Sequence, residues 1–99
     1  MIGAVPEELV EAVVRETARL AMTTVGEVEV VLAEQSLWGD GSLGCPEPGM
    51  AYAQALVTGY WLVLEAAGTS YDFRADSSGR FRLCPPGAGT PPRPRTDIY

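Results

Sequence analysis

The chain has 99 residues, of which 46% are hydrophobic and 20% are charged, enough for one globular domain and unlike a largely disordered protein. Thirteen acidic residues face seven arginines, and the formal charge of −6 disfavours binding to nucleic acid or to an anionic membrane surface. Lysine and histidine are both absent, which excludes Schiff-base catalysis and any general base or metal site built on histidine.

Residues 6–22 carry the pattern of one amphipathic helix. Pro6 suits the first helical turn, and Glu7 and Glu8 place negative charge at the positive end of the helix dipole. Positions on one face recur at spacings of three and four residues. These positions are Leu9, Val10, Val13, Val14, Thr17, Leu20 and Ala21. The helix should therefore bury one side against the rest of the protein.

Five strands are expected after the helix, at residues 27–38, 51–57, 60–66, 69–75 and 80–84. A slip in the polar–apolar alternation at Val31 and Leu32 indicates a bulge or a strand that is covered on both faces. Turns are expected at 67–68 and 76–79, where glycine, serine and aspartate gather, and a turn or a bulge is expected at 58–59. This order predicts an α+β fold in which one N-terminal helix packs on a four- to five-stranded antiparallel meander sheet.

The predicted core lies between the helix and one face of the sheet. Its sheet residues are Val28, Val30, Tyr60, Leu62, Leu64, Tyr71, Phe73, Phe81 and Leu83. On the last strand, Arg80 and Arg82 alternate with core positions and are expected to face water. Trp61 and Val63 alternate with core positions too, so they should lie on the outer face of the sheet. Such an apolar face either binds a partner or is covered by the loop or the tail of this chain.

The composition changes after Cys84. Residues 85–99 hold five of the eight prolines and little that is apolar before Ile98 and Tyr99. We therefore expect residues 1–84 to form a single domain and residues 85–99 to form a Pro-rich extended tail. Its two terminal residues are candidates for anchoring the tail to a partner.

The most specific stretch runs from Trp38 to Gln54. Its residues 40–54 read Asp-Gly-Ser-Leu-Gly-Cys-Pro-Glu-Pro-Gly-Met-Ala-Tyr-Ala-Gln, and Gly59-Tyr60 and Cys84 follow. This resembles a small bacterial domain of uncharacterised function with the pattern Asp-x-Ser-Leu-Gly-Cys-Pro-x-Pro-Gly-x-x-Tyr-x-Gln, then Gly-Tyr, then Cys. The resemblance implies a fold and no activity. The proline usual before Gly-Tyr and the histidine usual near position 74 are missing here.

Cys45 and Cys84 are the only cysteines. Without histidine they cannot complete a zinc site. They are candidates for one disulfide, and two buried free thiols are the alternative. A bond would tie the loop to the end of the last strand and stabilise the fold by roughly 3–4 kcal/mol in the loop-entropy account.

Catalytic and metal sites find little support. Asp40 and Ser42 could act as helper and nucleophile, but the Gly-x-Ser-x-Gly pattern is not matched and no base of suitable pKa follows. Asp40 and Glu47 could bind calcium, but their spacing is not that of an EF-hand. We expect no catalytic residue, no metal and no cofactor.

Three functions stay open. The preferred one is a non-catalytic protein-interaction module or accessory subunit, which binds a protein partner or a copy of itself. The alternatives are a small protease-inhibitor-like protein with a rigid loop at 44–50, and a small ligand- or metal-binding protein that uses Asp40, Glu47 and Tyr52. The candidate binding residues are Trp38, Trp61, Val63, Cys45, Pro46, Glu47, Pro48, Ile98 and Tyr99.

Neither the N-terminus nor the apolar runs indicate a membrane protein. No run approaches the roughly 20 apolar residues that span a bilayer. The first residues lack the basic region of a signal peptide. We expect no membrane insertion, and the compartment stays unassigned, with the cytoplasm preferred.

Overall fold

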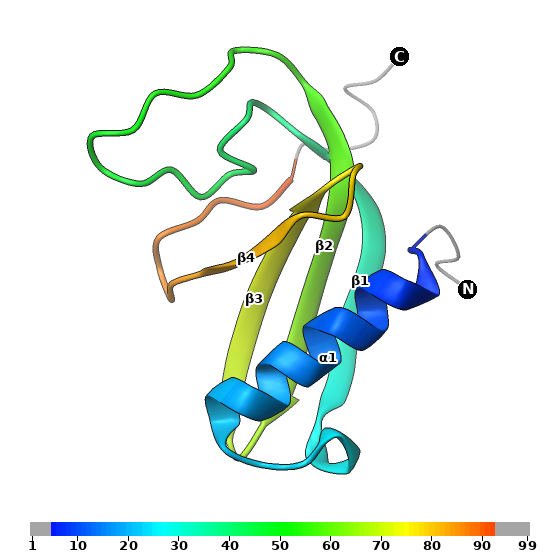
Figure 1. The fold of residues 1–99 in the computed structure, drawn as a ribbon. Coiled ribbons are helices and arrows are strands. Elements are labelled where there is room, and N and C mark those ends of the chain that lie inside the picture. The colour runs from blue at the N-terminus through cyan, green and yellow to red at the C-terminus, as the bar shows by residue number, and fades with distance from the viewer. Residues whose placement is uncertain (1–4, 93–99) are drawn as a thin grey trace.

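The computed structural model describes residues 5–92, which form one helix packed on a four-stranded antiparallel sheet (Figure 1). The elements are α1 (Glu7–Ala21), the 3-10 turn η1 (Val25–Glu27), β1 (Glu29–Trp38), β2 (Val57–Ala66), β3 (Thr69–Asp76) and β4 (Phe81–Cys84). The strands lie in chain order, β1-β2-β3-β4, and each pair is antiparallel. The predicted α+β fold with a meander sheet is confirmed.

Helix α1 crosses one face of the sheet, and its apolar stripe makes half of the core (Figure 1). The buried core residues are Leu9, Val13, Leu62, Leu64, Phe73 and Ala75. Each large side chain buried here contributes about 1.5–3 kcal/mol through the hydrophobic effect. Thr17 is also fully buried, and its hydroxyl donates to the Val13 carbonyl oxygen at 2.8 Å, so no polar group of that side chain is left unpaired.

The prediction of a strand at 51–57 was wrong. Residues 51–56 have no regular structure, and β2 begins only at Val57. The strand then runs in regular register through Thr58 and Gly59, where a turn or a bulge was expected. Gly59 passes so close to the backbone of β3 that a Cβ there would lie 3.1 Å from the Asp76 Cα and would overlap the Ala75 carbonyl oxygen. Glycine at this point serves close strand packing and does not mark a turn.

The other local features match the sequence pattern. The register of β1 against β2 shifts between Val30 and Leu32, which confirms the bulge. Ala67 and Gly68 join β2 to β3 with φ of 52° and 79°, as a two-residue hairpin turn requires. Residues 76–79 join β3 to β4, as predicted.

Two predicted core residues lie at the margins of the sheet. Val30 is 38% exposed and Leu83 is 39% exposed. They belong to the edge strands β1 and β4, whereas α1 packs mainly on β2 and β3. One further expectation was wrong, since Arg82 does not face water but contacts the loop after β1, with only 30% of its side chain exposed. Arg80 is exposed, as expected.

Candidate functional site

The face of the sheet opposite α1 is covered by two segments from distant parts of the sequence. One is the inner turn, residues 40–45, and the other is the C-terminal segment, residues 85–92. They bond to each other, because the Thr90 N–H donates to the Gly44 carbonyl oxygen at 2.8 Å. Gly89 packs so tightly that a Cβ there would lie 2.6 Å from the Cys84 Sγ. This end of the outer face is therefore an internal surface of the domain.

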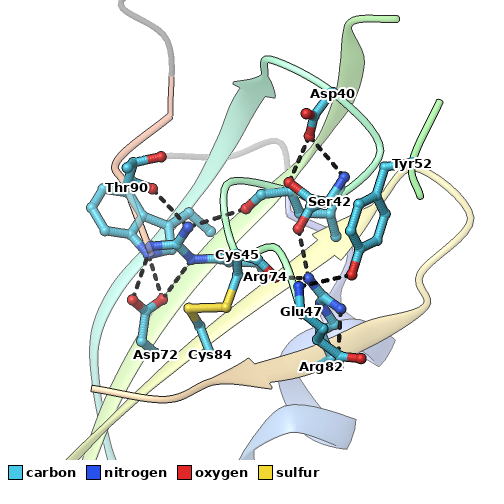
Figure 2. The surroundings of a disulfide bond; sticks show 12 residues. Asp40, Ser42, Cys45, Glu47, Tyr52, Asp72, Arg74, Arg82, Cys84 and Thr90 are labelled. Carbon is cyan, nitrogen blue, oxygen red and sulfur yellow. Dashed lines mark hydrogen bonds and ion pairs between the residues drawn. A yellow bond between two sulfur atoms is a disulfide. The ribbon is translucent and has the colours of Figure 1, made fainter. Parts of the chain in front are cut away.

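Arg74 on β3 holds both segments to the sheet (Figure 2). It is only 2% exposed. Its Nε and Nη2 donate to the two carboxylate oxygens of Asp72 at 3.1 and 3.0 Å. Its Nη1 donates to the carbonyl oxygens of Leu43 and Thr90, at 3.1 and 2.6 Å. The paired carboxylate and the two carbonyl oxygens offset the cost of burying this cation.

Two tryptophans enclose the same guanidinium group. The Arg74 Cζ lies 5.0 Å from the ring centroid of Trp38 and 5.8 Å from that of Trp61, within the range of cation–π attraction. The two indoles meet edge to face at 6.4 Å, and the Trp61 Nε1 donates to Asp72 at 2.8 Å. Trp38 is fully buried, and Trp61 and Val63 are half-buried. Of these predicted binding residues, Trp38 and Trp61 pack around the arginine that holds the covering segments.

Arg82 on β4 holds the inner turn from the next strand. It is the register partner of Arg74. Its Nη2 donates to the carbonyl oxygens of Ser42, at 2.7 Å, and of Cys45. Its Nη1 lies 3.4 Å from a carboxylate oxygen of Glu47. Two neighbouring arginines thus bind the backbone of a single turn.

A disulfide adds a covalent link at the same place. Cys45 in the inner turn is bonded to Cys84 at the end of β4, which confirms the predicted pairing (Figure 2). The two cysteines are 3% and 2% exposed. The inner turn is thus held to the sheet by one covalent bond and by two guanidinium groups.

Asp40 and Ser42 build the inner turn itself. One carboxylate oxygen of Asp40 accepts from the Ser42 hydroxyl at 2.6 Å and from the Ser42 N–H at 2.9 Å. These bonds, first from the hydroxyl and then from the N–H, lower the pKa of the Asp40 carboxyl from its ordinary value. Leu43 and Gly44 then adopt φ of 59° and 72°, which turns the chain back toward the sheet.

Residues 46–56 form the outer loop, which extends from the inner turn to β2 (Figure 1). The Gly41 N–H donates to the Ala53 carbonyl oxygen at 2.9 Å and closes the base of the loop. Within the loop, the Glu47 N–H donates to the Tyr52 hydroxyl at 3.0 Å. The Tyr52 ring in turn lies 5.8 Å from the Arg82 guanidinium.

The outer loop presents apolar side chains to solvent. All of its residues are exposed except Tyr52, which is half-buried. Met50 is 58% exposed and Leu56 is 57% exposed. The predicted binding residues Pro46, Glu47 and Pro48 also lie in this loop.

A surface cavity of about 350 Å³ lies beside the inner turn. Its lining includes Trp38, Asp40, Ser42 and Thr90. The structure does not gather these groups into a metal site, because residues 5–92 contain no cluster of three or more potential ligands. No helix in that part of the chain is long and apolar enough to cross a membrane.

The remaining predicted residues, Ile98 and Tyr99, lie outside the described residues, as does the rest of the predicted tail beyond Pro92. The sequence interpretation did not identify Arg74 and Arg82 as the residues that hold the loop. A signal was present, because alternation along β3 places Asp72 and Arg74 on the same face as Trp61. A charged pair on an otherwise apolar face indicates a buried polar contact.

Comparison with known proteins places the chain in a family. A family model described as a domain of unknown function, DUF8738, matches residues 10–84. No curated protein and no solved structure matches the chain. The matched region includes β1 to β4, both arginines that hold the inner turn, and both cysteines. Since the match covers more than half of its residues, the chain belongs to the DUF8738 family of domains of unknown function.

Proposed function

We propose that this domain is a non-catalytic protein-interaction module that presents the outer loop, residues 46–56, to a partner protein. One observation carries the proposal. The base of the loop is fixed to the sheet by the Cys45–Cys84 disulfide and by Arg82, while its far part is exposed and carries Met50 and Leu56.

The fixed base lowers the cost of binding. Ordering a free loop on association costs conformational entropy, and a loop that is already constrained loses less. Here the disulfide, the Gly41–Ala53 hydrogen bond and the Glu47–Tyr52 hydrogen bond constrain the chain before any partner arrives. Exposed apolar side chains on such a frame are suited to fill a pocket on another protein.

The candidate catalytic groups, Asp40 and Ser42, bond to each other within the fold. Ser42 is 3% exposed, and its hydroxyl donates to Asp40. The lowered pKa of the Asp40 carboxyl makes it a weak base, so it is poorly suited to activate a hydroxyl nucleophile. This supports a binding function over a hydrolytic one.

The two alternative functions have weaker support than the interaction module. A substrate-like inhibitory loop would need an extended, exposed backbone, but Gly44 and Cys45 are not exposed, and the Met50 N–H donates to the Glu47 carbonyl oxygen to form a tight turn. A small-ligand function would use the cavity beside Asp40. The exposed apolar residues of the outer loop favour the interaction module over both alternative functions.

A photo-crosslinking experiment tests the proposal. A photoreactive phenylalanine analogue is introduced at Met50 or, as the control, at Ser77, which is exposed in the turn between β3 and β4. Irradiation in the cell of origin should give a discrete protein adduct from position 50 and none from position 77. Equal labelling from both positions, or no adduct from position 50, would contradict the proposal.

The captured protein then allows an affinity measurement. Met50→Ser should weaken binding about tenfold, as the loss of an apolar contact in the centre of an interface does. Met22→Ser is the matched control, since Met22 is 91% exposed at the C-terminal end of α1, far from the loop in the sequence. Its affinity should stay within about twofold of the original.

A further inference from the structure

Strand β1 forms a long edge of the sheet, open except near its end, where Ser36 and Trp38 are buried. It has 10 residues and, within the described chain, pairs only with β2 (Figure 1). Natural sheet edges are usually protected by short strands, charged side chains, proline or bulges. The sequence of β1, Glu-Val-Val-Leu-Ala-Glu-Gln-Ser-Leu-Trp, holds no proline, its one bulge lies near the start, and its only charged residues are Glu29 and Glu34. From Leu32 to Trp38 the edge is regular.

Exposed apolar residues lie near the start of this edge, where η1 leads into β1. A groove of about 320 Å³ lies between the helix and η1, lined by Val10, Val14 and Val25, with Glu11 and Arg15 at its rim. Val25 belongs to η1, which leads directly into β1, and it is 54% exposed. Val30 and Val31 at the start of β1 are 38% and 51% exposed. Val25, Val30 and Val31 are thus exposed apolar residues where the chain enters β1.

The opposite side of the same edge is acidic. Glu29 and Glu34 both face away from α1. Two residues five positions apart on a regular strand would face opposite sides, but the bulge between these two adds one residue and brings them to the same side. Glu29 lies directly opposite Glu65 on β2, an unfavourable pairing of like charges. Within residues 5–92, none of these three carboxylates takes part in an ion pair; the arginines on that face, Arg74 and Arg82, are bonded to other groups.

We propose that the β1 edge binds an extended segment of a partner protein in which basic and apolar residues alternate. The segment adds as a fifth strand, as in other cases of strand addition to an open edge. Its apolar side chains enter the groove beside Val25, and its basic side chains pair with Glu29 and Glu34. The site is separate from the outer loop, so this inference does not depend on the function proposed above.

Charge argues against a second copy of the chain at this edge. Two β1 strands paired with each other would bring the glutamates of both copies to the same face of one sheet. Each copy also carries a net charge of −6. Like charges placed opposite each other destabilise strand pairing, whereas a basic segment relieves the repulsion that already exists between Glu29 and Glu65.

Synthetic peptides test the proposal on the intact protein. The probe is a ten-residue peptide of alternating arginine and valine, matched to the length of β1. The control has the same composition with all arginines before all valines, so that a strand cannot separate the two types onto opposite faces. Calorimetry should show binding of the alternating peptide that is about tenfold tighter than binding of the control.

Two further measurements locate the site. Amide exchange at alternate positions from Leu32 to Gln35 should slow by about tenfold with the peptide bound, because outward N–H groups acquire acceptors. Glu29→Gln combined with Glu34→Gln should weaken binding about fivefold through two lost ion pairs. Glu7→Gln with Glu8→Gln, which removes the same charge from the first turn of α1, should change it less than about twofold.

Several results would overturn the inference. They are absence of binding by the alternating peptide at about 1 mM, equal binding of the control peptide, and unchanged exchange in β1. Equal losses from the two glutamate pairs would show general attraction to an acidic protein. A dimer in solution with slowed exchange along β1 would show that a second copy occupies the edge.

Discussion

Arg74 on β3 and Arg82 on β4 lie directly opposite each other in the sheet, and both donate to backbone carbonyl oxygens of the inner turn. Like charges in this position normally destabilise strand pairing. Here the Leu43 carbonyl accepts from one guanidinium, and the Ser42 and Cys45 carbonyls accept from the other. The pairing of β3 with β4 and the conformation of the turn therefore depend on each other.

The first prediction concerns the buried arginine. Arg74→Lys should lower the free energy of unfolding by about 3 kcal/mol, because an ammonium group cannot hold Asp72 through two parallel bonds and also reach two carbonyl oxygens. Urea unfolding measures the change. Arg80→Lys is the control, since 88% of that side chain is exposed, and its effect should stay within about 0.5 kcal/mol. Similar effects from both variants would contradict the role given to Arg74.

Local patterns in the sequence predicted the fold well. The apolar face of α1, the bulge in β1 and the turn at 67–68 follow from short-range periodicity and turn chemistry. The structure differs from the prediction where long-range contacts determine the conformation of the chain. Residues 51–56 were predicted to begin a strand, but they are held in a loop whose base is closed by a bond between Gly41 and Ala53.

The candidate site was predictable in part. The count of two cysteines made one disulfide a candidate, with two free thiols as the alternative, and the structure contains the disulfide. The cover over Trp38 depends on Arg74, which bonds to partners 31 and 16 positions away in the sequence. No local pattern reports such contacts, because they depend on the register of β3 and on where the chain returns after β4.

The second prediction concerns the disulfide. Replacing Cys45 and Cys84 together by alanine should lower the free energy of unfolding by about 4 kcal/mol in the chain-entropy account, given the 39-residue separation. Denaturant unfolding of the double variant beside the original protein measures this. Amide exchange in the outer loop should become faster at the same time. A loss below about 1 kcal/mol would show that the arginines suffice to hold the turn.

The third prediction concerns close packing of β2 on β3. Gly59→Ala should lower the free energy of unfolding by about 3 kcal/mol, because the new methyl group would overlap the Ala75 carbonyl oxygen and the two strands would have to separate. Gly26→Ala serves as the control, since the nearest atom to a Cβ there is the Thr24 hydroxyl oxygen at 4.0 Å. Thermal unfolding of the two variants should separate them clearly, and equal melting temperatures would refute the steric account.

The fourth prediction concerns acid. Burial raises the pKa of the Asp76 carboxyl. Hydrogen bonds from the Ser78 hydroxyl and from the Arg80 and Ser78 N–H groups, together with the Arg80 charge, lower this pKa by a larger amount, so the net shift is downward. A lowered folded-state pKa stabilises the protein above the ordinary value near 4 and loses that contribution as the pH falls through the folded-state pKa.

Asp76→Asn removes this titration. The original protein should be more stable than the variant at neutral pH, and the difference should shrink as the pH falls below about 4. Urea unfolding at a series of pH values measures both proteins under matched ionic strength. A difference that stays constant down to about pH 2 would show that the carboxylate charge does not stabilise the β3–β4 turn.

The last prediction concerns the C-terminal segment, residues 85–92. A chain that ends at Cys84 should be less stable than one that ends at Pro92 by about 2–3 kcal/mol, because the buried Arg74 loses the Thr90 carbonyl oxygen and the Gly44 carbonyl loses the Thr90 N–H. Urea unfolding of the two truncated chains measures this difference, and both keep β1 to β4. Gly89→Ala in the longer chain should also lower its free energy of unfolding, since a Cβ would lie 2.8 Å from the Arg74 Nη1. If the two truncated chains unfold at the same urea concentration, the segment contributes nothing to the domain, and the outer face of the sheet is then free to meet a partner.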